Sequence, residues 1–193
     1  MLNRKSDSPL KVSKFIKLAY EQAKINLGST GSNPSVGCVI EKNGSVIASA
    51  HTSLNGRPHA EFNALNKKVN FKNSNIYISL EPCSHYGKTP PCTKIIIKKK
   101  IKKVFFSIFD VDKRSNKKSI HNLRNKNILV KNGINEKYGK MFYESYNLNK
   151  KKLLPYLDAK IAISKDYFTK NISSKWITNQ QSRKIAHLIR SNY

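Results

Sequence analysis

The sequence predicts an α/β domain with three layers, in which a mixed five-stranded sheet lies between two layers of helices. Over the first 148 residues, segments with apolar residues at helical spacing alternate with short runs of β-branched and aromatic residues, which are typical of strands. The first two of these runs are adjacent, and the others are separated by helical segments. Antiparallel and parallel neighbours are therefore expected within one sheet.

The first predicted helix covers residues 8–28. Ser8 and Pro9 form a pair that favours an N-cap and a first helical turn, and Gly28 is expected to end the helix. Apolar residues repeat at helical spacing along one side, which predicts a surface that faces the core. They are Val12, Phe15, Ile16, Ala19, Ala23 and Leu27.

The next elements continue this alternation. Asn43 and Gly44 stand between two β-branched runs within residues 35–50, a pattern that favours a hairpin. Pro58 is expected to open the second helix. Helices are predicted at 57–69, 92–100, 117–126 and 135–148, and strands at 75–80, 103–109 and 127–131. The last helix is expected to place four large side chains on one side: Tyr138, Met141, Phe142 and Tyr146.

A change in composition after residue 148 predicts the end of this first domain, 1–148. Residues 149–155 are interpreted as a linker. Residues 156–193 are predicted to hold a strand, a turn region and a helix, in this order. Because so few residues cannot bury enough apolar surface to fold alone, we expect this segment to dock on other protein or to begin a second, incomplete α/β domain.

The composition favours a globular protein in a reducing compartment. The net charge is +26, but lysines occur throughout the chain together with abundant Asn and Ile. This distribution indicates compositional drift rather than a nucleic-acid surface, which would gather its cations on one face. The sequence shows neither a run of about 18 apolar residues nor the apolar region of a signal peptide, so a cytoplasmic location is expected. Three cysteines, an odd number, favour reduced ligands over a disulfide framework.

Two short motifs indicate a metal site with hydrolytic chemistry. His59, Cys83 and Cys92 form the kind of set that catalytic zinc uses, with three protein ligands and a fourth position for water. Glu61 follows His59 by two residues and could exchange protons with that water. A His-x-Glu motif combined with Pro-Cys after a strand is typical of zinc nucleobase deaminases, in which the glutamate moves the protons.

A purely structural zinc site is the alternative, and it would need a fourth protein ligand. Cys38 or His85 would have to provide it. Cys38 stands in an apolar strand and is expected to be a small core residue, whereas His85 is expected to face the pocket or to cap its loop. The structural alternative also gives Glu61 no role, so we favour a catalytic site.

Five stretches of the sequence carry a resemblance to a known family: 33–40 (NPSVGCVI), 59–65 (HAEFNAL), 80–92 (LEPCSHYGKTPPC), 158–164 (DAKIAIS) and 175–184 (KWITNQQSRK). They resemble the bifunctional deaminase/reductase of bacterial riboflavin biosynthesis, which implies a cytidine-deaminase-like domain followed by a reductase domain. The similarity covers nearly the whole chain. Its most specific part is the insertion between Cys83 and Cys92, which separates it from cytidine and tRNA-adenosine deaminases.

The resemblance implies a reaction, the hydrolytic deamination of 2,5-diamino-6-ribosylamino-4(3H)-pyrimidinone 5′-phosphate to 5-amino-6-(5-phosphoribosylamino)uracil. It implies that Glu61 is the proton donor and that zinc is held by His59, Cys83 and Cys92. It also implies that three residues line the substrate pocket: Asn33, His51 and Lys88. Lys88 suits this role as a cation near a phosphorylated ligand.

The sequence departs from the family pattern at two places. Ser32 stands where the family has a proline before Asn33, and residues 110–112 are Asp-Val-Asp where the family has Asp-Pro-Asn. The tail resembles the start of the NADPH-dependent reductase domain at positions associated with nucleotide or substrate contact. These are Ser174, Trp176 and Thr178 for the cofactor, and Lys160 and Arg190 for the reductase substrate. NADPH binding and reductase activity are expected only with a complete second domain.

Two other functions stay open at this stage. One is a zinc deaminase that acts on nucleic acid, of the tRNA-adenosine type, which the positive charge would suit. It predicts a steep dependence of binding on salt. The other is an inactive remnant of the bifunctional enzyme. The favoured partner is a small phosphorylated pyrimidine, with neither membrane nor nucleic acid involved, and a homo-oligomer is left open.

Overall fold

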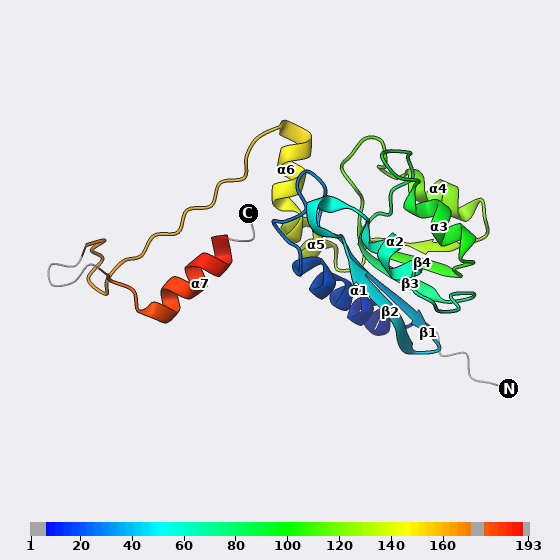
Figure 1. The fold of residues 1–193 in the computed structure, drawn as a ribbon, viewed down its shortest axis with the longest axis horizontal. Coiled ribbons are helices and arrows are strands. Elements are labelled where there is room, and N and C mark those ends of the chain that lie inside the picture. The colour runs from blue at the N-terminus through cyan, green and yellow to red at the C-terminus, as the bar shows by residue number, and fades with distance from the viewer. Residues whose placement is uncertain (1–6, 171–175, 191–193) are drawn as a thin grey trace.

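The computed structural model describes residues 7–170 and 176–190. Elements α1 to α6 pack around the sheet, and residues 153–164 form an extended segment that leads away from them (Figure 1). The strands are β1 (Gly37–Lys42), β2 (Ser45–His51), β3 (Asn75–Leu80), β4 (Lys103–Ile108) and β5 (Leu129–Lys131). The helices are α1 (Pro9–Lys24), α2 (Ala60–Leu65), α3 (Cys92–Lys98), α4 (Lys118–Arg124), α5 (Glu136–Phe142), α6 (Glu144–Lys152) and α7 (Gln180–Arg190), with a 3-10 helix at Leu54–Gly56.

The five strands form one mixed sheet in the order β2-β1-β3-β4-β5. Strand β1 runs antiparallel to both β2 and β3, whereas β3, β4 and β5 run parallel to one another. Helices α1 and α5 cover one face of the sheet, and α2, α3 and α4 cover the other (Figure 1). The predicted three-layer α/β/α fold with five strands is therefore confirmed.

Helix α1 packs on the sheet through side chains at helical spacing. Ser8 caps the helix with its side chain and Pro9 occupies the first turn, as the sequence predicts. The buried residues of the helix are Val12, Phe15, Ile16, Ala19, Tyr20 and Ala23. The helix ends at Lys24, so Gly28 lies in the following turn with a φ of 78°. Leu27 also lies beyond the helix and is only half-buried.

A close approach between α1 and the sheet requires glycine at the start of β1. A Cβ atom on Gly37 would lie 1.8 Å from the carbonyl oxygen of Ala19. Cβ and oxygen atoms cannot come so close, so any other residue here would push α1 away from the sheet. At the other end of β1, Asn43 and Gly44 both have positive φ, 53° and 91°, which the tight turn of the predicted hairpin requires.

The ends of four strands meet at one edge of the sheet. Because β3 and β4 are parallel, their C-terminal ends lie at this edge and lead into Glu81 and Phe109. Strand β1 is antiparallel to β3, so its first residue, Gly37, lies at the same edge, paired with His51 at the end of β2. The loops that leave these ends are therefore close together, and the predicted metal ligands belong to this region.

The structure corrects two predicted helices. The helix expected over 57–69 is limited to α2, because His59 is still extended, with φ −70° and ψ 157°, and serves as the N-cap. Pro58 therefore precedes the helix instead of opening it. The helix expected over 135–148 is divided into α5 and α6, because Tyr143 has non-helical angles, φ −99° and ψ 18°. Helix α6 then continues to Lys152.

One side of α5 and α6 packs against the core almost as predicted. Tyr138, Phe142 and Tyr146 contact the buried core residues. Met141, which was predicted on the same side, is 63% exposed. Met141 lies in α5 together with Tyr138 and Phe142, before the break at Tyr143, so the break does not explain its exposure.

The tail differs from the sequence-based expectation. Residues 153–164 contain neither helix nor strand, although a strand was predicted in the first part of the tail. A strand needs a neighbour for its backbone hydrogen bonds, and none of the strands in the described part of the chain pairs with this segment. The predicted helix is present as α7. In residues 7–170 and 176–190, no helix combines the length and apolar character that a membrane span needs.

Candidate metal centre

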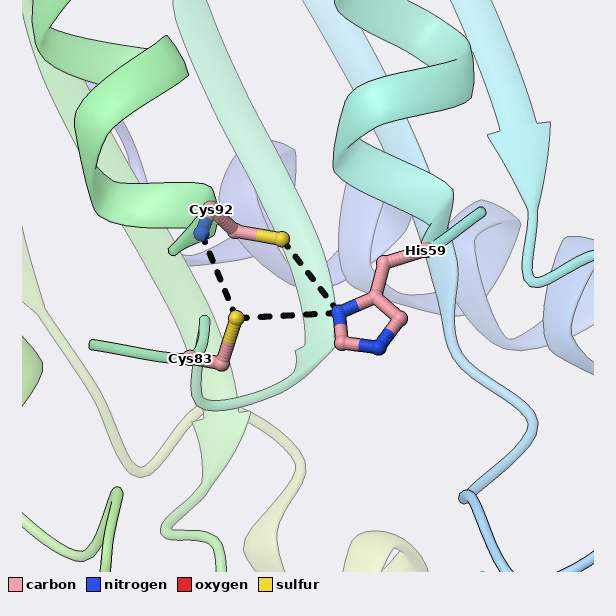
Figure 2. A group of neighbouring side chains, drawn as sticks. All are labelled: His59, Cys83 and Cys92. Atoms are coloured by element: carbon pink, nitrogen blue, oxygen red, sulfur yellow. Dashed lines mark hydrogen bonds between the residues drawn. The ribbon is translucent and has the colours of Figure 1, made fainter. Parts of the chain in front are cut away.

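Three side chains from separate elements converge at the sheet edge described above (Figure 2). His59 directly precedes α2, Cys83 follows β3, and Cys92 is the first residue of α3. Their ligand atoms, one ring nitrogen and two sulfurs, all lie within 4.8 Å of one another. Folding therefore brings together the three residues that the sequence singled out as metal ligands.

The distances between these atoms fit a tetrahedral metal ion. Nδ1 of His59 lies 3.6 Å from Sγ of Cys83 and 3.5 Å from Sγ of Cys92. In a tetrahedral zinc site with Zn–N of about 2.05 Å and Zn–S of about 2.3 Å, the N···S separation is about 3.6 Å. Thiolate sulfur and imidazole nitrogen are also ligands that zinc prefers. The set fits a zinc ion that keeps a fourth position for another ligand.

Hydrogen bonds favour the thiolate form of Cys83. The side chain of Cys92 hydrogen-bonds Sγ of Cys83, His59 also contacts this sulfur, and the backbone N–H of Cys92 donates to it over 3.2 Å. Together these contacts lower the pKa of the Cys83 thiol to about 4. The Cys92 thiol donates its hydrogen bond to Cys83 and is buried, so its pKa is raised. Cys83 is therefore the first of the two thiols to lose its proton.

Glu61 lies beside these ligands in the first turn of α2 and is 3% exposed. Burial raises the pKa of its carboxyl to about 7, although the neighbouring His59 opposes this shift. A carboxyl group with a pKa near neutrality can both accept and donate a proton at neutral pH. Glu61 also lines a cavity together with His59 and Cys83, so its side chain borders open space beside the metal ligands.

This cavity extends from the metal ligands along the sheet edge. Its wall includes Asn33, Thr52, Arg57, His85, Asp112 and Lys150. The side-chain amide of Asn33 donates to the backbone carbonyl of Gly56 over 3.3 Å, which fixes its direction at the wall. Of the three residues that the resemblance assigns to the substrate pocket, Asn33 is the one that lines the cavity.

The other two assigned residues, His51 and Lys88, do not line the cavity. The backbone carbonyl of His51 accepts a hydrogen bond from the Asn63 side chain over 2.9 Å. Its ring Nδ1 is buried, and the described residues offer that nitrogen no hydrogen-bond partner. Lys88 is exposed in the loop between the two cysteine ligands and does not line the cavity.

Cys38 and His85, the two candidates for a fourth protein ligand, both lie outside the group of metal ligands. Cys38 is fully buried in β1 and belongs to the hydrophobic core, as predicted. His85 lines the cavity, and its Nδ1 lies 2.9 Å from the hydroxyl oxygen of Ser115. Within the described residues, neither belongs to the group of possible metal ligands. Among the described residues the site therefore has three protein ligands, which leaves the fourth position of a tetrahedral metal ion open.

The cavity also contains residues that the sequence analysis did not connect with the site: Arg57, Glu81, Arg114, Tyr146 and Lys150. Glu81 accepts hydrogen bonds from the backbone N–H groups of Asp110, Lys117 and Ser119 and from the Ser119 hydroxyl. It thereby fixes the loop between β4 and α4 against the metal site. Its place directly after a strand and before Pro-Cys was the signal that could have revealed it.

The residues assigned to a reductase site lie in the tail. Lys160, Trp176 and Arg190 are exposed, and Thr178 is half-buried. Ser174 lies outside the described residues. The described members of this group do not line the metal cavity, so they take no part in the candidate site.

The fold and the site together define a class of protein. A three-layer α/β domain that holds a His/Cys/Cys group beside a buried glutamate has the arrangement of the zinc-dependent deaminases. Residues 10–108 match the family described as the cytidine and deoxycytidylate deaminase zinc-binding region. The chain therefore belongs to this family.

Within this family the chain is similar to proteins of riboflavin biosynthesis. The riboflavin biosynthesis protein RibD of Aquifex aeolicus is 37% identical over 179 residues, which cover 91% of this chain and 50% of that protein. The chloroplastic riboflavin biosynthesis protein PYRD of Zea mays is 38% identical over 133 residues, or 68% of this chain and 34% of that protein. The chain spans about half the length of the curated RibD relatives that it matches.

Solved structures give the same result. RibD of Acinetobacter baumannii superposes with a TM-score of 0.85 at 34% identity, over 95% of this chain and 52% of that chain. A Thermotoga maritima protein described as a diaminohydroxyphosphoribosylaminopyrimidine deaminase/5-amino-6-(5-phosphoribosylamino)uracil reductase also gives 0.85, at 33% identity, over 93% and 53% of the two chains. The predicted resemblance and the cytidine-deaminase-like fold are therefore confirmed.

Proposed function

We propose that the chain deaminates 2,5-diamino-6-ribosylamino-4(3H)-pyrimidinone 5′-phosphate to 5-amino-6-(5-phosphoribosylamino)uracil with the help of zinc. The observation that carries this proposal is the buried Glu61 in the cavity of a His/Cys/Cys metal group. The names of the similar proteins, which state riboflavin biosynthesis and this deaminase activity, support the choice of substrate.

Each residue of the site has a separate role in this reaction. His59, Cys83 and Cys92 would hold zinc, which acts as a Lewis acid and makes water a stronger nucleophile at neutral pH. Glu61 takes a proton from the attacking water and delivers it to the departing amino group, which leaves as ammonia. The ring carbon loses its bond to nitrogen and gains one to the water oxygen, so the reaction needs no other reactant.

Three further residues are proposed to bind the substrate. Asn33 lines the cavity and is suited to a polar group of the pyrimidine. His51 does not line the cavity, but its buried Nδ1 has no hydrogen-bond partner among the described residues, and this nitrogen is proposed to meet the substrate. Lys88 is exposed on the loop between the cysteine ligands, and it is proposed to turn toward the phosphate when the substrate binds.

The proposal is tested with purified protein and the synthetic pyrimidine ribotide. We expect about one zinc per chain and the release of ammonia in the wild type. Glu61→Gln should keep its zinc and lose its activity, because it retains the shape of the side chain but cannot accept the proton. A matched control is Glu21→Gln, which replaces an exposed glutamate of α1 and should be fully active.

Several outcomes would contradict the proposal. A fully active Glu61→Gln would show that another group moves the proton. A wild type that releases ammonia from an oligoribonucleotide and not from the ribotide would favour the nucleic-acid alternative, and a wild type without zinc or activity would favour the inactive remnant. The cytoplasmic location and the absence of a nucleic-acid partner stay predictions from the sequence.

We also propose a division of the chain into a deaminase domain at 1–148, a linker at 149–155 and the start of a reductase domain at 156–193. The match to the deaminase family, which lies within the first part, supports this division. Helix α6 continues to Lys152, inside the proposed linker. The assigned cofactor residue Trp176 is exposed and does not line the metal cavity, so the addition of NADPH to this chain should leave the fluorescence of Trp176 unchanged.

A further inference from the structure

Two oppositely charged residues are paired at the wall of the metal cavity. Asp112 and Arg114 belong to the loop between β4 and α4, and both line the cavity that contains Glu61. Nε of Arg114 lies 3.0 Å from Oδ1 and 3.2 Å from Oδ2 of Asp112, and Nη2 lies 2.5 Å from Oδ2. The guanidinium therefore holds the carboxylate through two nitrogens, the geometry of a strong charge-assisted pair.

The two members of this pair are held in different ways. The N–H of Asp112 donates to Oδ1 of Asp110 over 2.9 Å, and its carbonyl accepts from the N–H groups of Ser115 and Asn116. The Asp112 side chain is 14% exposed, whereas that of Arg114 is 63% exposed. Backbone contacts thus fix Asp112 at the wall, while the side chain of Arg114 is held by Asp112.

The position of Asp112 has an electrostatic consequence for any ligand. It presents an ionised carboxylate to the cavity, because its hydrogen bonds with Arg114 lower its pKa to about 2. Glu81, another acid of the same wall, is surrounded by four hydrogen-bond donors and is shielded by them. A phosphate group that enters the cavity would be repelled by a bare carboxylate at Asp112, and the charge of Arg114 offsets this repulsion.

We infer that Arg114 is a specificity-determining residue, which neutralises Asp112 so that a substrate with an anionic phosphate group can enter the metal cavity. This inference rests on the proposed function for the charge of the substrate. Arg114 acts through Asp112 and does not have to touch the substrate. Two other cations of the wall, Arg57 and Lys150, take part in none of the ion pairs of the described residues and remain for the phosphate itself.

A double-mutant cycle tests this inference in the zinc-loaded full chain. The variants are Arg114→Met, Asp112→Asn and the two combined, and kcat and KM for the ribotide are measured separately. We expect Arg114→Met to raise KM about tenfold at low salt with little change in kcat, because Asp112 is then uncompensated. Salt at about 500 mM should reduce this effect by screening. Adding Asp112→Asn should return KM to within about twofold of the wild type.

Two results would overturn the inference. If the combined variant keeps the high KM of Arg114→Met, Arg114 contacts the substrate directly. If Asp112→Asn alone raises KM as much as Arg114→Met does, the pair serves to hold the loop and not to balance charge. The unphosphorylated ribonucleoside is the matched control, since its KM should be the same in the wild type and in Arg114→Met.

A binding measurement separates this inference from the proposed function. Ribose 5-phosphate is titrated into the zinc-loaded proteins, which reports affinity for the anion without turnover. We expect weaker binding in Arg114→Met and recovery in the combined variant. This pattern without ammonia release would overturn the proposed function and leave the inference standing. Equal affinity in the wild type and Arg114→Met, or no binding in either, would overturn the inference.

Discussion

Two buried glutamates at opposite edges of the sheet differ in acid strength. Glu61, beside the metal ligands, has its pKa raised to about 7 by burial. Glu41, near the other end of β1, has a pKa below its ordinary value, although burial alone would raise it. Both side chains are almost closed to solvent, with exposures of 3% and 2%, but Glu61 is enclosed more deeply by the surrounding protein than Glu41. The depth of burial and the groups around each carboxylate both contribute to the difference in pKa.

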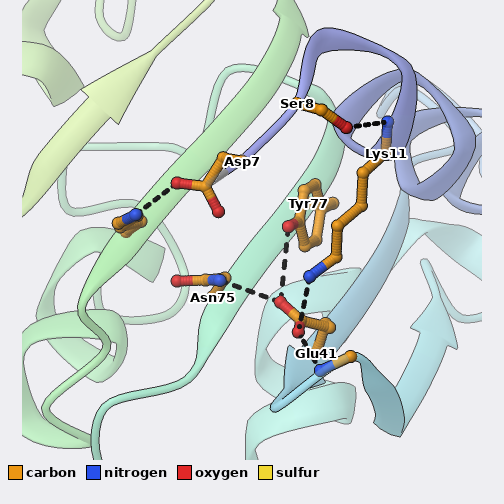
Figure 3. A network of polar contacts seen from close by, with 8 residues as sticks. Asp7, Ser8, Lys11, Glu41, Asn75 and Tyr77 are labelled. Carbon is orange, nitrogen blue, oxygen red and sulfur yellow. Dashed lines mark hydrogen bonds and ion pairs between the residues drawn. The ribbon is translucent and has the colours of Figure 1, made fainter. Parts of the chain in front are cut away.

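Hydrogen-bond donors surround Glu41 (Figure 3). Its Oε1 accepts from the backbone N–H of Gly44 and lies 3.2 Å from Nζ of Lys11. Its Oε2 accepts from the Asn75 side chain over 2.8 Å and from the Tyr77 hydroxyl over 3.4 Å. These contacts outweigh the effect of burial and keep Glu41 ionised. The carboxylate thus joins α1, the hairpin and β3 at this edge.

Glu61 has burial without such a set of donors. Its own backbone N–H, the Cys92 side chain and His59 lower its pKa, but burial has the larger effect. Burial thus brings the pKa of this carboxyl toward neutrality, where a group can both accept and donate a proton. The comparison teaches that a buried glutamate stabilises the fold where donors satisfy it, and is available for chemistry where they do not.

The largest expected contrast between the two edges is in activity. Glu61→Gln should lower kcat by about 10²–10⁴-fold, the usual contribution of a general acid–base. Glu41→Gln should leave kcat per folded molecule within about twofold of the wild type, because its contacts lie at the opposite edge. Initial rates of ammonia release, divided by bound zinc, measure both. A similar loss in the two variants would break the comparison.

The free energy of unfolding should show the reverse order, because Glu41→Gln should lose more stability than Glu61→Gln. Glu41→Gln should reduce the free energy of unfolding by about 1–3 kcal/mol at pH 7, because an amide cannot satisfy the donors that the carboxylate accepts from. Glu61→Gln in the zinc-free protein should have a free energy of unfolding equal to or above that of the wild type, since it removes a buried, poorly satisfied acid. Urea unfolding of the two variants and the wild type provides the measurement. A Glu61→Gln protein less stable than Glu41→Gln would contradict it.

The sequence predicted the metal site correctly because its ligands leave local patterns. His59 and Glu61 share one motif, and Cys83 and Cys92 flank one loop, each after a proline. The Asn-Gly turn and the apolar runs likewise predict the hairpin and the sheet from nearest neighbours along the chain. These features do not depend on how distant segments meet.

The wall of the cavity could not be predicted in the same way. With 37 lysines and arginines in the chain, no pattern distinguishes Arg57, Arg114 or Lys150 from the others, and they become neighbours only when separate loops meet. Two further features could not be predicted for a similar reason: the break at Tyr143 and the absence of the strand expected in the first part of the tail, where residues 153–164 contain neither helix nor strand. Both depend on what a segment packs against or pairs with, and the local sequence does not contain that information.

A smaller effect is expected in the pH dependence of stability. The pKa of Glu41 is lower in the folded chain than its ordinary value of 4.5, so ionised Glu41 stabilises the fold above that pH. This contribution should disappear as the pH falls below 4.5 and through the folded pKa. The difference in unfolding free energy between the wild type and Glu41→Gln should therefore shrink between pH 6 and pH 3. A difference that is constant over this range would mean that Glu41 acts by shape alone.

The smallest expected effect concerns the loop between the cysteine ligands. One side-chain hydrogen bond joins Thr89 of this loop to the edge of the site, whereas several contacts hold Glu41. Nη1 of Arg57 donates to the Thr89 hydroxyl over 2.6 Å and thereby holds this loop at the cavity. Thr89→Val should raise KM about twofold to threefold without loss of zinc, because one exposed hydrogen bond contributes little. In an Arg57→Met background, Thr89→Val should add nothing further if both act through this contact. Independent, additive effects would instead mean that Thr89 does not act through its contact with Arg57.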